Sequence, residues 1–492
     1  GCPPAPSQPA ADPPPTVPPP PTAPARPTAV PSPTPPPTFA EGSTIAGVAV
    51  AGLTLAEAAE LLEERLADAP AALALEAGER SYSLALAPLD LALPVEELIA
   101  RARPAFERGT PADVPPAVTF DEKALRERLA ALADEVAAES SLSVITTTDA
   151  LTRTFVYTPG LALDVDGAVE RVGAALAEAA LAGDAPEPIA LELAPAEAPP
   201  RAPLELLRAE AAALAEVVPG VVGLHLIDLE SGESIGLNDR TVFAGASTIK
   251  TAVMLFLYIQ QEELTERQTF WLNEMIRFSD NLSANDLLAT AMGGQTTEAA
   301  FAGADAMSTL LQEELGLRHT YLYVPYETTD FIKLYKPKYR CGPQGRVGEA
   351  PYTEMGACLR AEPASMARLY QLINQCADDG GELLERYERL TPERCQQMLD
   401  WLAQNGDKTR MVAGVPKGVR VEHKSGWIED MNADAGIVRS PGGDYALAIY
   451  YYRPLDDKRD YWTDEELAPV VAAFSHLVYT AYNPVEAGQQ GD

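Results

Sequence analysis

The sequence is poor in histidine, cysteine and basic residues. Its 492 residues include only 4 His and 5 Cys, and none of them has the short Cys/His spacing that metal sites use. We therefore predict no metal site and no other cofactor. With 37 Lys and Arg against 72 Asp and Glu, the formal net charge is −35. Such a charge provides no attraction to a phosphate backbone, which argues against nucleic acid as a partner.

Long apolar segments are also missing. The longest candidate, residues 252–259, falls far short of the roughly 18 apolar residues that a membrane-spanning helix needs. The composition, 47% hydrophobic and 22% charged, is typical of a globular protein. Because one hydrophobic core cannot serve so long a chain, we expect two or three domains and a multidomain α+β fold.

Proline is concentrated at the N-terminus. Residues 3–40 consist mainly of Pro, Ala, Thr and Ser, which cannot bury a core, so residues 1–40 are predicted to form a disordered, extended tether. The start at Gly1-Cys2, without an initiator methionine, resembles the lipid-bearing junction of a bacterial lipoprotein. The resemblance implies a lipid anchor on Cys2 and an extracytoplasmic protein of the cell envelope, at the outer face of the cytoplasmic membrane. A free terminal thiol is the alternative.

Four other cysteines lie in the C-terminal part of the chain. An even number of cysteines in an exported protein is compatible with two disulfides, and the sequence leaves all three pairings open. These residues are Cys341, Cys358, Cys376 and Cys395.

Residues 41–200 contain a repeated pattern of strand, turn and helix. Gly-Leu-Thr-Leu at 52–55 and Gly-Leu-Ala-Leu at 160–163 each precede an Ala-rich helix, and a further helix is predicted at 121–138 between the copies. No nucleophile–base pair occurs in this region. The pattern therefore predicts a small α+β domain without visible chemistry.

Two segments of this domain are similar to cell-wall proteins. Residues 47–54 read Gly-Val-Ala-Val-Ala-Gly-Leu-Thr, and residues 159–164 read Pro-Gly-Leu-Ala-Leu-Asp. Both resemble the peptidoglycan-binding domains found before transpeptidase and vancomycin-resistance-type domains. The resemblance implies contact with peptidoglycan through residues 41–200, and a spacer or docking domain is the alternative.

Prolines mark the start of a second domain, predicted to span residues 201–484 and to be followed by a tail at 485–492. A helix at 205–217 and a hairpin at 221–237 precede three short motifs. Each motif is common by itself, and their order in the chain carries the information. In that order they are Ser247-Thr248-Ile249-Lys250, Ser279-Asp280-Asn281 and Lys424-Ser425-Gly426.

The first two motifs can supply an activated nucleophile. The apolar run 251–256 predicts a buried helix, on which Ser247 and Lys250 share a face. A serine hydroxyl needs a base, and a lysine whose pKa is lowered by burial and nearby cations can serve. Ser279 can relay a proton toward the leaving nitrogen, while Asn281 can bond both Lys250 and a substrate amide.

The third motif is predicted to line the substrate site from an edge strand. Lys424 offers positive charge to a substrate carboxylate, Ser425 adds a hydroxyl, and Gly426 leaves room for a close backbone approach. The backbone N–H groups of Ser247, at the helix N-terminus, and of Trp427 would form the oxyanion hole.

Together the motifs resemble the signature of class A β-lactamases and penicillin-binding proteins, Ser-x-x-Lys, Ser-Asp-Asn and Lys-Thr-Gly. The resemblance covers about residues 205–483. It implies an antiparallel sheet flanked by helices, with a helical subdomain, and a serine hydrolase that attacks a β-lactam or related amide through an acyl-Ser247 intermediate. A D,D-peptidase-like, penicillin-binding cell-wall enzyme and a non-hydrolytic cell-wall ligand-binding lipoprotein are the alternatives.

The chain departs from the class A enzymes at the residue that activates water for deacylation. Those enzymes carry this residue as the glutamate of an Arg-x-Glu-x-x-x-Asn pattern, which the long interval 321–359 lacks. Glu327 lies nearest the expected place and is the candidate base, ahead of Glu349 and Glu354; a solvated loop carboxylate is the alternative. Without such a base, an acyl-enzyme would break down slowly.

Overall fold

The structure is a computed structural model that describes residues 36–149, 151–179, 181, 187–195 and 201–488. Its helices and sheets confirm the predicted α+β fold class. Cys2, the predicted lipid anchor, and most of the predicted tether lie outside the described residues. The end of that tether is already packed, because Phe39 is buried and its N–H donates to the Leu53 carbonyl at 2.8 Å.

The described residues fall into two compact units. The first takes residues up to 131 together with 165–192, and the second takes 132–164 together with those from 193 onward. The sequence predicts a single boundary between these parts of the chain, after residue 200. In the structure the chain passes from one unit to the other three times, after residues 131, 164 and 192.

Strand pairing explains why residues 132–164 belong to the second unit. The strand β7 (Arg153–Thr158) pairs with β6 (Ser141–Thr146) and, in parallel, with β19 (Val485–Glu486) near the end of the chain. Phe155 of β7 is fully buried, and its N–H donates to Thr480 Oγ1 at 3.2 Å. Residues 485–486, predicted as part of a tail, are therefore part of a sheet.

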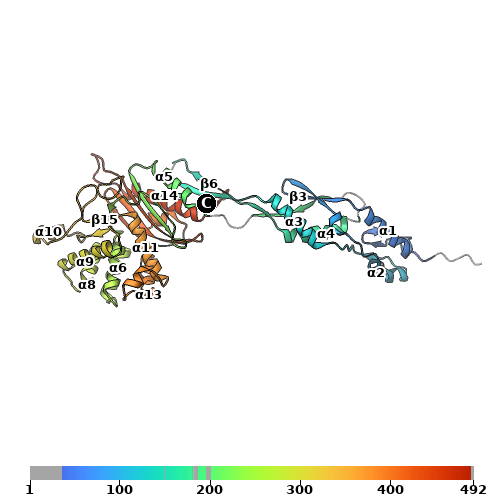
Figure 1. The fold of residues 1–492 in the computed structure, drawn as a ribbon, viewed down its shortest axis with the longest axis horizontal. Coiled ribbons are helices and arrows are strands. Elements are labelled where there is room, and N and C mark those ends of the chain that lie inside the picture. Colours follow the sequence, from blue (N-terminus) through green and yellow to red (C-terminus); the bar gives the residue numbers. More distant parts are fainter. Residues whose placement is uncertain (1–35, 150, 180, 182–186, 196–200, 489–492) are drawn as a thin grey trace, which may run out of the picture. The chain divides into compact units, whose positions relative to one another are not determined.

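The first unit packs helices on small sheets (Figure 1). Its first helix, α1 (Leu55–Ala67), begins at a capping box, in which the Thr54 side chain accepts from the Glu57 N–H and the Glu57 carboxylate accepts from the Thr54 N–H. The other elements are β1 (Thr44–Ile45), β2 (Val48–Ala49), β3 (Ala72–Ala77), β4 (Arg80–Ala85), η1 (Ala87–Leu89), α2 (Val95–Arg108), β5 (Asp113–Val114), α3 (Glu122–Val136), which continues into the second unit, α4 (Val165–Ala179) and β9 (Ile189–Leu191).

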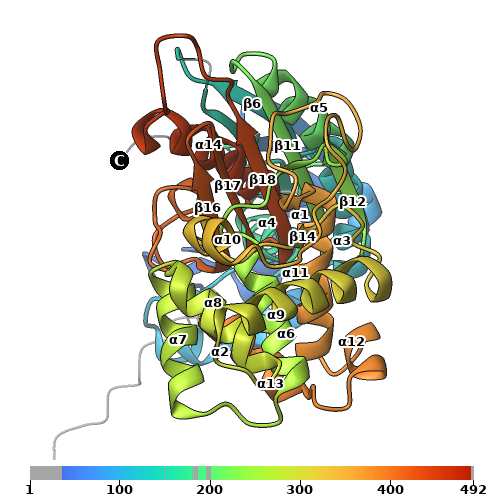
Figure 2. The same ribbon diagram turned by 90° about the vertical axis from the view of Figure 1, so that its left-hand side faces the viewer.

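The second unit is built on a five-stranded antiparallel sheet of order β12-β11-β18-β17-β16 (Figure 2). Its central strand β18 alternates between two cores, because successive side chains point to opposite faces. Tyr445, Leu447, Ile449 and Tyr451 face the cluster that contains α5 (Leu204–Ala215) and α14 (Asp464–Tyr482), and Ala446, Ala448 and Tyr450 face the other helices. The strands are β11 (Val221–Asp228), β12 (Ser234–Leu237), β16 (Arg420–Ile428), β17 (Met431–Arg439) and β18 (Tyr445–Tyr452).

The helix α6 (Lys250–Gln260) lies at the centre of the helical subdomain. It is apolar on every side, and residues 250–259 are all buried. A helix of this composition needs neighbours all round. They come from one face of the sheet and from α7 (Glu266–Arg277), α8 (Asn281–Ala291), α9 (Thr297–Thr309), α11 (Pro363–Ala377) and α13 (Pro392–Leu402). The arrangement is the predicted sheet with a helical subdomain.

The remaining elements of the second unit are short or lie at its edges. They are β8 (Leu161–Leu163), β10 (Leu193–Pro195), α5 (Leu204–Ala215), β13 (Phe243–Ala244), the π-helical turn η2 (Leu310–Glu314), β14 (Tyr321–Leu322), α10 (Thr329–Tyr335), β15 (Leu359–Ala361), α12 (Glu382–Arg386), η3 (Met411–Gly414) and α14 (Asp464–Tyr482). None of the helices among the described residues is long and apolar enough to cross a lipid bilayer.

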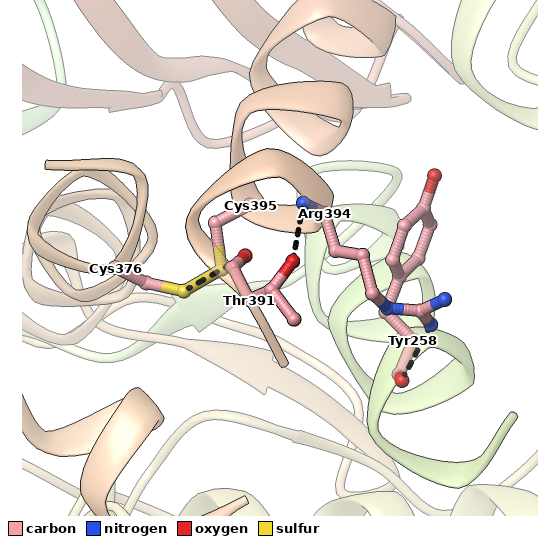
Figure 3. Close-up of a disulfide and its surroundings, with 5 residues drawn as sticks. All are labelled: Tyr258, Cys376, Thr391, Arg394 and Cys395. Carbon is pink, nitrogen blue, oxygen red and sulfur yellow. Dashed lines mark hydrogen bonds between the residues drawn. A yellow bond between two sulfur atoms is a disulfide. The ribbon is translucent and has the colours of Figure 1, made fainter. Parts of the chain in front are cut away.

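The C-terminus of α6 is capped by an arginine that lies beside a disulfide (Figure 3). Arg394 donates to the carbonyls of Tyr258 at 2.9 Å and of Gln261 at 2.7 Å, which satisfies backbone groups that a helix end leaves open. The adjacent Cys395 is bonded to Cys376, so that α13 is joined to α11. The other disulfide joins Cys341 to Cys358. The structure thus selects one of the three pairings that the sequence leaves open.

Candidate active site

A tight turn presents Ser247 at the start of α6. Ala246, just before it, has a φ of 44°, a left-handed conformation that costs energy for any residue with a side chain. The turn is held by Thr248, whose hydroxyl donates to the Gly245 carbonyl at 2.6 Å and shares a hydrogen bond of 2.6 Å with the Tyr450 hydroxyl. Ser247 itself is half-buried and so remains open to a ligand.

The ammonium group of Lys250 lies among oxygen acceptors. It donates to Ser247 Oγ at 3.0 Å and to Asn281 Oδ1 at 2.6 Å. It also lies 2.6 Å from the Ser279 carbonyl oxygen and 3.3 Å from Ser279 Oγ. One side of the ammonium faces the ring of Tyr326, whose centroid is 4.6 Å away. The first two motifs therefore meet at this amine.

The pKa of Lys250 is lowered to about 7, far below the ordinary value for lysine. Burial is the main cause, and the nearby charge of Lys424 adds to it, while Asp280 and Glu327 act in the opposite direction. A substantial fraction of this lysine is therefore neutral near pH 7. A neutral amine at 3.0 Å from a hydroxyl can accept its proton.

The middle residue of the second motif has a structural role. Asp280 is the N-cap of α8, and its carboxylate accepts from the Ser283 N–H at 2.7 Å. This cap fixes the turn in which Ser279, with a φ of 59°, precedes the helix. As a result, Ser279 and Asn281 both reach Lys250 from the same turn.

The third motif approaches from β16. Lys424 is fully buried and donates to Ser279 Oγ at 3.0 Å and to the Ser425 carbonyl at 2.9 Å. Burial lowers its pKa to about 8, against the influence of the Asp434 and Asp407 carboxylates. The group is therefore mostly charged near pH 7.

Gly426 lies where the strand meets the start of α6. A Cβ atom built on it would lie 2.7 Å from the backbone nitrogen of Ser247 and 2.9 Å from that of Thr248. The next residue, Trp427, is 63% exposed. The Ser425 side chain hydrogen-bonds Asp407, whose pKa is held at about 2. Burial would raise that pKa, but a neighbouring arginine and hydrogen bonds outweigh it.

Glu327, the candidate base, contacts the site through Asn281. Its Oε1 accepts from Asn281 Nδ2 at 2.7 Å, while the rest of the side chain is exposed. The other two candidates lie elsewhere: Glu349 is bonded through its backbone to Arg240, and Glu354 lies near Asp430. Of the three glutamates, only Glu327 contacts a motif residue among the contacts found in the described chain.

Two residues that sequence reasoning missed hold the Glu327 loop. Asn285 bonds both backbone groups of Tyr326, accepting from its N–H at 2.9 Å and donating to its carbonyl at 2.8 Å. The Tyr326 hydroxyl donates to the Ala246 carbonyl at 2.9 Å, just before the nucleophile. The sequence does contain one indication of the role of Asn285, because it lies one helical turn beyond Asn281 on the same face of α8.

The described residues contain no group of three or more His, Cys, Asp or Glu that could hold a metal ion. The chemistry of this site is that of two hydroxyls, two amines, an amide and a carboxylate.

If Ser247 is the nucleophile that the motifs predict, replacing Gly426 by Ala should slow its acylation. The added methyl group would press on backbone atoms that cannot move aside without shifting the turn at Ser247. We expect the rate of labelling by a fluorescent penicillin to fall about 100-fold, as for other losses of oxyanion geometry. Gly356→Ala, which places a methyl group in open space, is the matched control. Unchanged labelling of the Gly426 variant would show that the strand does not approach the turn this closely.

Comparison with known proteins supports the resemblance seen in the motifs. The β-lactamase enzyme family matches residues 206–270 and 269–482. Among solved structures, this chain is similar to PBP-A, with 22% sequence identity and a TM-score of 0.41. The match covers 58% of this chain and 99% of PBP-A. A class A β-lactamase from Mycobacterium abscessus is 18% identical over 56% of this chain and 99% of its own, with a TM-score of 0.40. No curated protein matches the chain. Because the family match spans more than half of the sequence, the chain belongs to the β-lactamase enzyme family.

Proposed function

We propose that this protein is a serine hydrolase that forms an acyl-enzyme at Ser247 and hydrolyses a β-lactam or a related amide. The observation that carries the proposal is the contact between Lys250 Nζ and Ser247 Oγ at 3.0 Å, made by an amine whose pKa is about 7. A buried, partly neutral lysine beside a half-buried serine has the properties of a general base with its nucleophile.

Acylation would proceed in two proton-coupled steps. Ser247 Oγ attacks the substrate carbonyl while Lys250 takes the hydroxyl proton, and the oxyanion is stabilised by the N–H groups of Ser247 and Trp427. The C–N bond then breaks, and the leaving nitrogen receives a proton through Ser279. Ser279 Oγ suits this relay because it lies 3.3 Å from Lys250 Nζ and 3.0 Å from Lys424 Nζ.

Lys424 is proposed to hold the carboxylate of the substrate. Its charge is buried, and it lies on the strand that passes closest to Ser247. Asn281 Nδ2 would bind the substrate amide, and in the present structure it donates to Glu327. A substrate amide carbonyl would therefore compete with the Glu327 carboxylate for this donor.

Deacylation needs a base for water, and Glu327 is the proposed base. Its link to Asn281 keeps the carboxylate at the edge of the site. One observation favours a second candidate, a penicillin-binding, D,D-peptidase-like enzyme. The residue of this loop that lies against Lys250 is Tyr326, whose ring cannot activate water. In that case the acyl-enzyme would persist.

Two further parts of the proposal rest on sequence alone. They are contact of residues 41–200 with peptidoglycan, and a location in the cell envelope with a lipid on Cys2, which lies outside the described residues.

Ser247→Ala should abolish covalent labelling by a fluorescent penicillin, because the other hydroxyl found beside Lys250 in the described chain, that of Ser279, does not lie at the turn against which Gly426 packs. Labelling is followed on denaturing gels and turnover by hydrolysis of the β-lactam. Ser231→Ala, in an exposed turn, is the control. Fast turnover by the parent protein indicates a β-lactamase and stable labelling indicates a penicillin-binding enzyme. Labelling of the Ser247→Ala variant at the parental rate would refute the proposed nucleophile.

The acylation rate should show a bell-shaped dependence on pH. It should rise through about pH 7, as Lys250 loses its proton and becomes a base, and fall above about pH 8, as Lys424 loses the charge that binds the carboxylate. Stopped-flow acylation across this range gives both limbs. With a β-lactam methyl ester, which has no free carboxylate, the alkaline limb should disappear while the acidic limb stays. An alkaline limb that persists with the ester would contradict the role of Lys424.

Glu327→Gln should lengthen the lifetime of the acyl-enzyme about 100-fold or more, since loss of a general base typically costs that factor. The acylation rate should change far less, because Lys250 serves that step. Pulse-chase release of fluorescent penicillin measures the lifetime. Asp330→Asn, an exposed carboxylate of the same loop with a side chain 91% exposed, is the matched control. An unchanged lifetime would favour the penicillin-binding alternative.

A further inference from the structure

The loop that follows Glu327 has a charge opposite to that of the whole chain. From residue 331 to residue 348 the sequence contains no Asp or Glu, although the chain has 72 acidic residues and a formal net charge of −35. The cations of this segment are Lys333, Lys336, Lys338, Arg340 and Arg346. We refer to residues 331–348 as the basic loop.

The first part of the basic loop exposes apolar side chains. The helix α10 (Thr329–Tyr335) contains no buried residue. Leu334 is 75% exposed, Tyr335 is 68% exposed and Tyr339 is 45% exposed. Side chains exposed to this extent contribute little to the packing of the fold.

The basic loop is nevertheless fixed to the second unit. Phe331 stacks on Phe301 of α9 with ring centroids 6.0 Å apart, and Tyr339 lies 5.7 Å from the same ring. Beyond these contacts, the disulfide between Cys341 and Cys358 joins the loop to the residues before β15. The exposed side chains of α10 are therefore attached to a segment that is itself fixed to the second unit.

Three cations of the basic loop have no ion-pair partner within the described part of the chain. Lys333 lies 3.5 Å from Asp330, and Arg340 pairs with Asp305. Lys336, Lys338 and Arg346 are exposed, and of these Arg346 already lies over the ring of Tyr352, 5.1 Å from its centroid. Lys336 and Lys338 lie in the sequence beside the exposed Leu334, Tyr335 and Tyr339.

We propose that the basic loop docks on an anionic lipid surface, with Leu334 and Tyr335 inserted at the headgroup level and Lys336 and Lys338 bound to acidic headgroups. Tyrosine and leucine beside lysines are typical of segments that lie in the membrane interface. Charge complementarity selects an anionic surface. The aliphatic Leu334 selects a lipid surface over a soluble polyanion, which offers no apolar phase to receive it.

The acidity of the rest of the chain does not prevent this contact. Charges separated by more than about 10 Å are largely screened at ordinary salt concentrations, so the local charge of the loop governs its approach to a surface. The contact is independent of any lipid on Cys2, and a protein with both would have two separate attachments to a membrane.

Vesicle co-sedimentation of the full 492-residue chain tests the proposal. Cys2→Ser is included in every sample, so that no acyl chain can be attached. We expect binding to vesicles of phosphatidylglycerol and phosphatidylcholine in equal parts, little binding to phosphatidylcholine alone, and weaker binding as salt is added. A protein that stays in the supernatant with the anionic vesicles would overturn the proposal.

Paired variants separate the loop from general charge. Lys336→Glu with Lys338→Glu should lower the partition coefficient by at least roughly tenfold. Lys123→Glu with Lys417→Glu makes the same change in net charge at exposed positions elsewhere and should bind like the parent protein. Equal losses in the two pairs would show that the basic loop is not the contact.

The apolar part of the loop has its own variant. Leu334→Ser keeps the charge and should still weaken vesicle binding, and because Leu334 is 75% exposed, the change leaves the core and the aromatic contacts of the loop intact. If this variant binds as well as the parent protein while soluble poly(glycerol phosphate) displaces both from the vesicles, the loop is a polyanion site and the membrane proposal is wrong.

Discussion

The buried ammonium group of Lys250 is the constraint on which the rest of the site depends. Removing a charged lysine from water is costly unless the protein supplies partners, and the remaining cost lowers its pKa. The partners come from the turn before α8, through Ser279 and Asn281, and from the loop that carries Tyr326. Residues 252–259 of α6 fix where the lysine lies, because they are all buried and cannot turn toward water. Packing and chemistry therefore depend on the same helix. The sheet completes the site because Lys424 of β16 donates to the Ser279 hydroxyl, which Lys250 also contacts.

The sequence predicts the centre of this site well because each motif combines a chemical group with a local geometry. Ser247 lies in the turn that leads into α6 and not on the predicted helix, yet the spacing of three residues still brings its hydroxyl to Lys250. The structure adds that Asp280 caps α8 and so fixes the turn that brings Ser279 and Asn281 together. The contacts of Tyr326 could not be predicted in this manner. Asn285 binds it across a sequence separation of 41 residues, and no local pattern encodes such a contact. The α+β class of residues 41–200 follows from periodicity, and the sheet with its helical subdomain follows from the resemblance that the motifs carry. The disulfide pairing, by contrast, depends on how α11 and α13 pack in space.

The loop between the second and third motifs separates this chain from the enzymes that it resembles. Tyr326 uses its hydroxyl to hold the carbonyl before the nucleophile and its ring to cover the lysine. Glu327 is left with an outward position and a single contact to the site, through Asn281. In the proposed mechanism, the same few residues would influence both how fast water reaches an acyl-serine and how firmly a substrate amide is held. A small change in this loop could move the balance between turnover and trapping while leaving the three motifs intact.

The strand β7 has a consequence for how the hydrolase can be isolated or exchanged between proteins. It comes from residues well before the family match, yet its Phe155 is buried in the hydrolase core and Arg153 pairs with Glu210 of α5 at 2.6 Å. A fragment trimmed to residues 206–482 would lack both β7 and β19 and would leave the surface of α14 around Thr480 uncovered. The unit that could move intact from one protein to another is therefore larger than the three motifs suggest. It includes residues 132–164, which lie in the sequence between the two segments of the first unit.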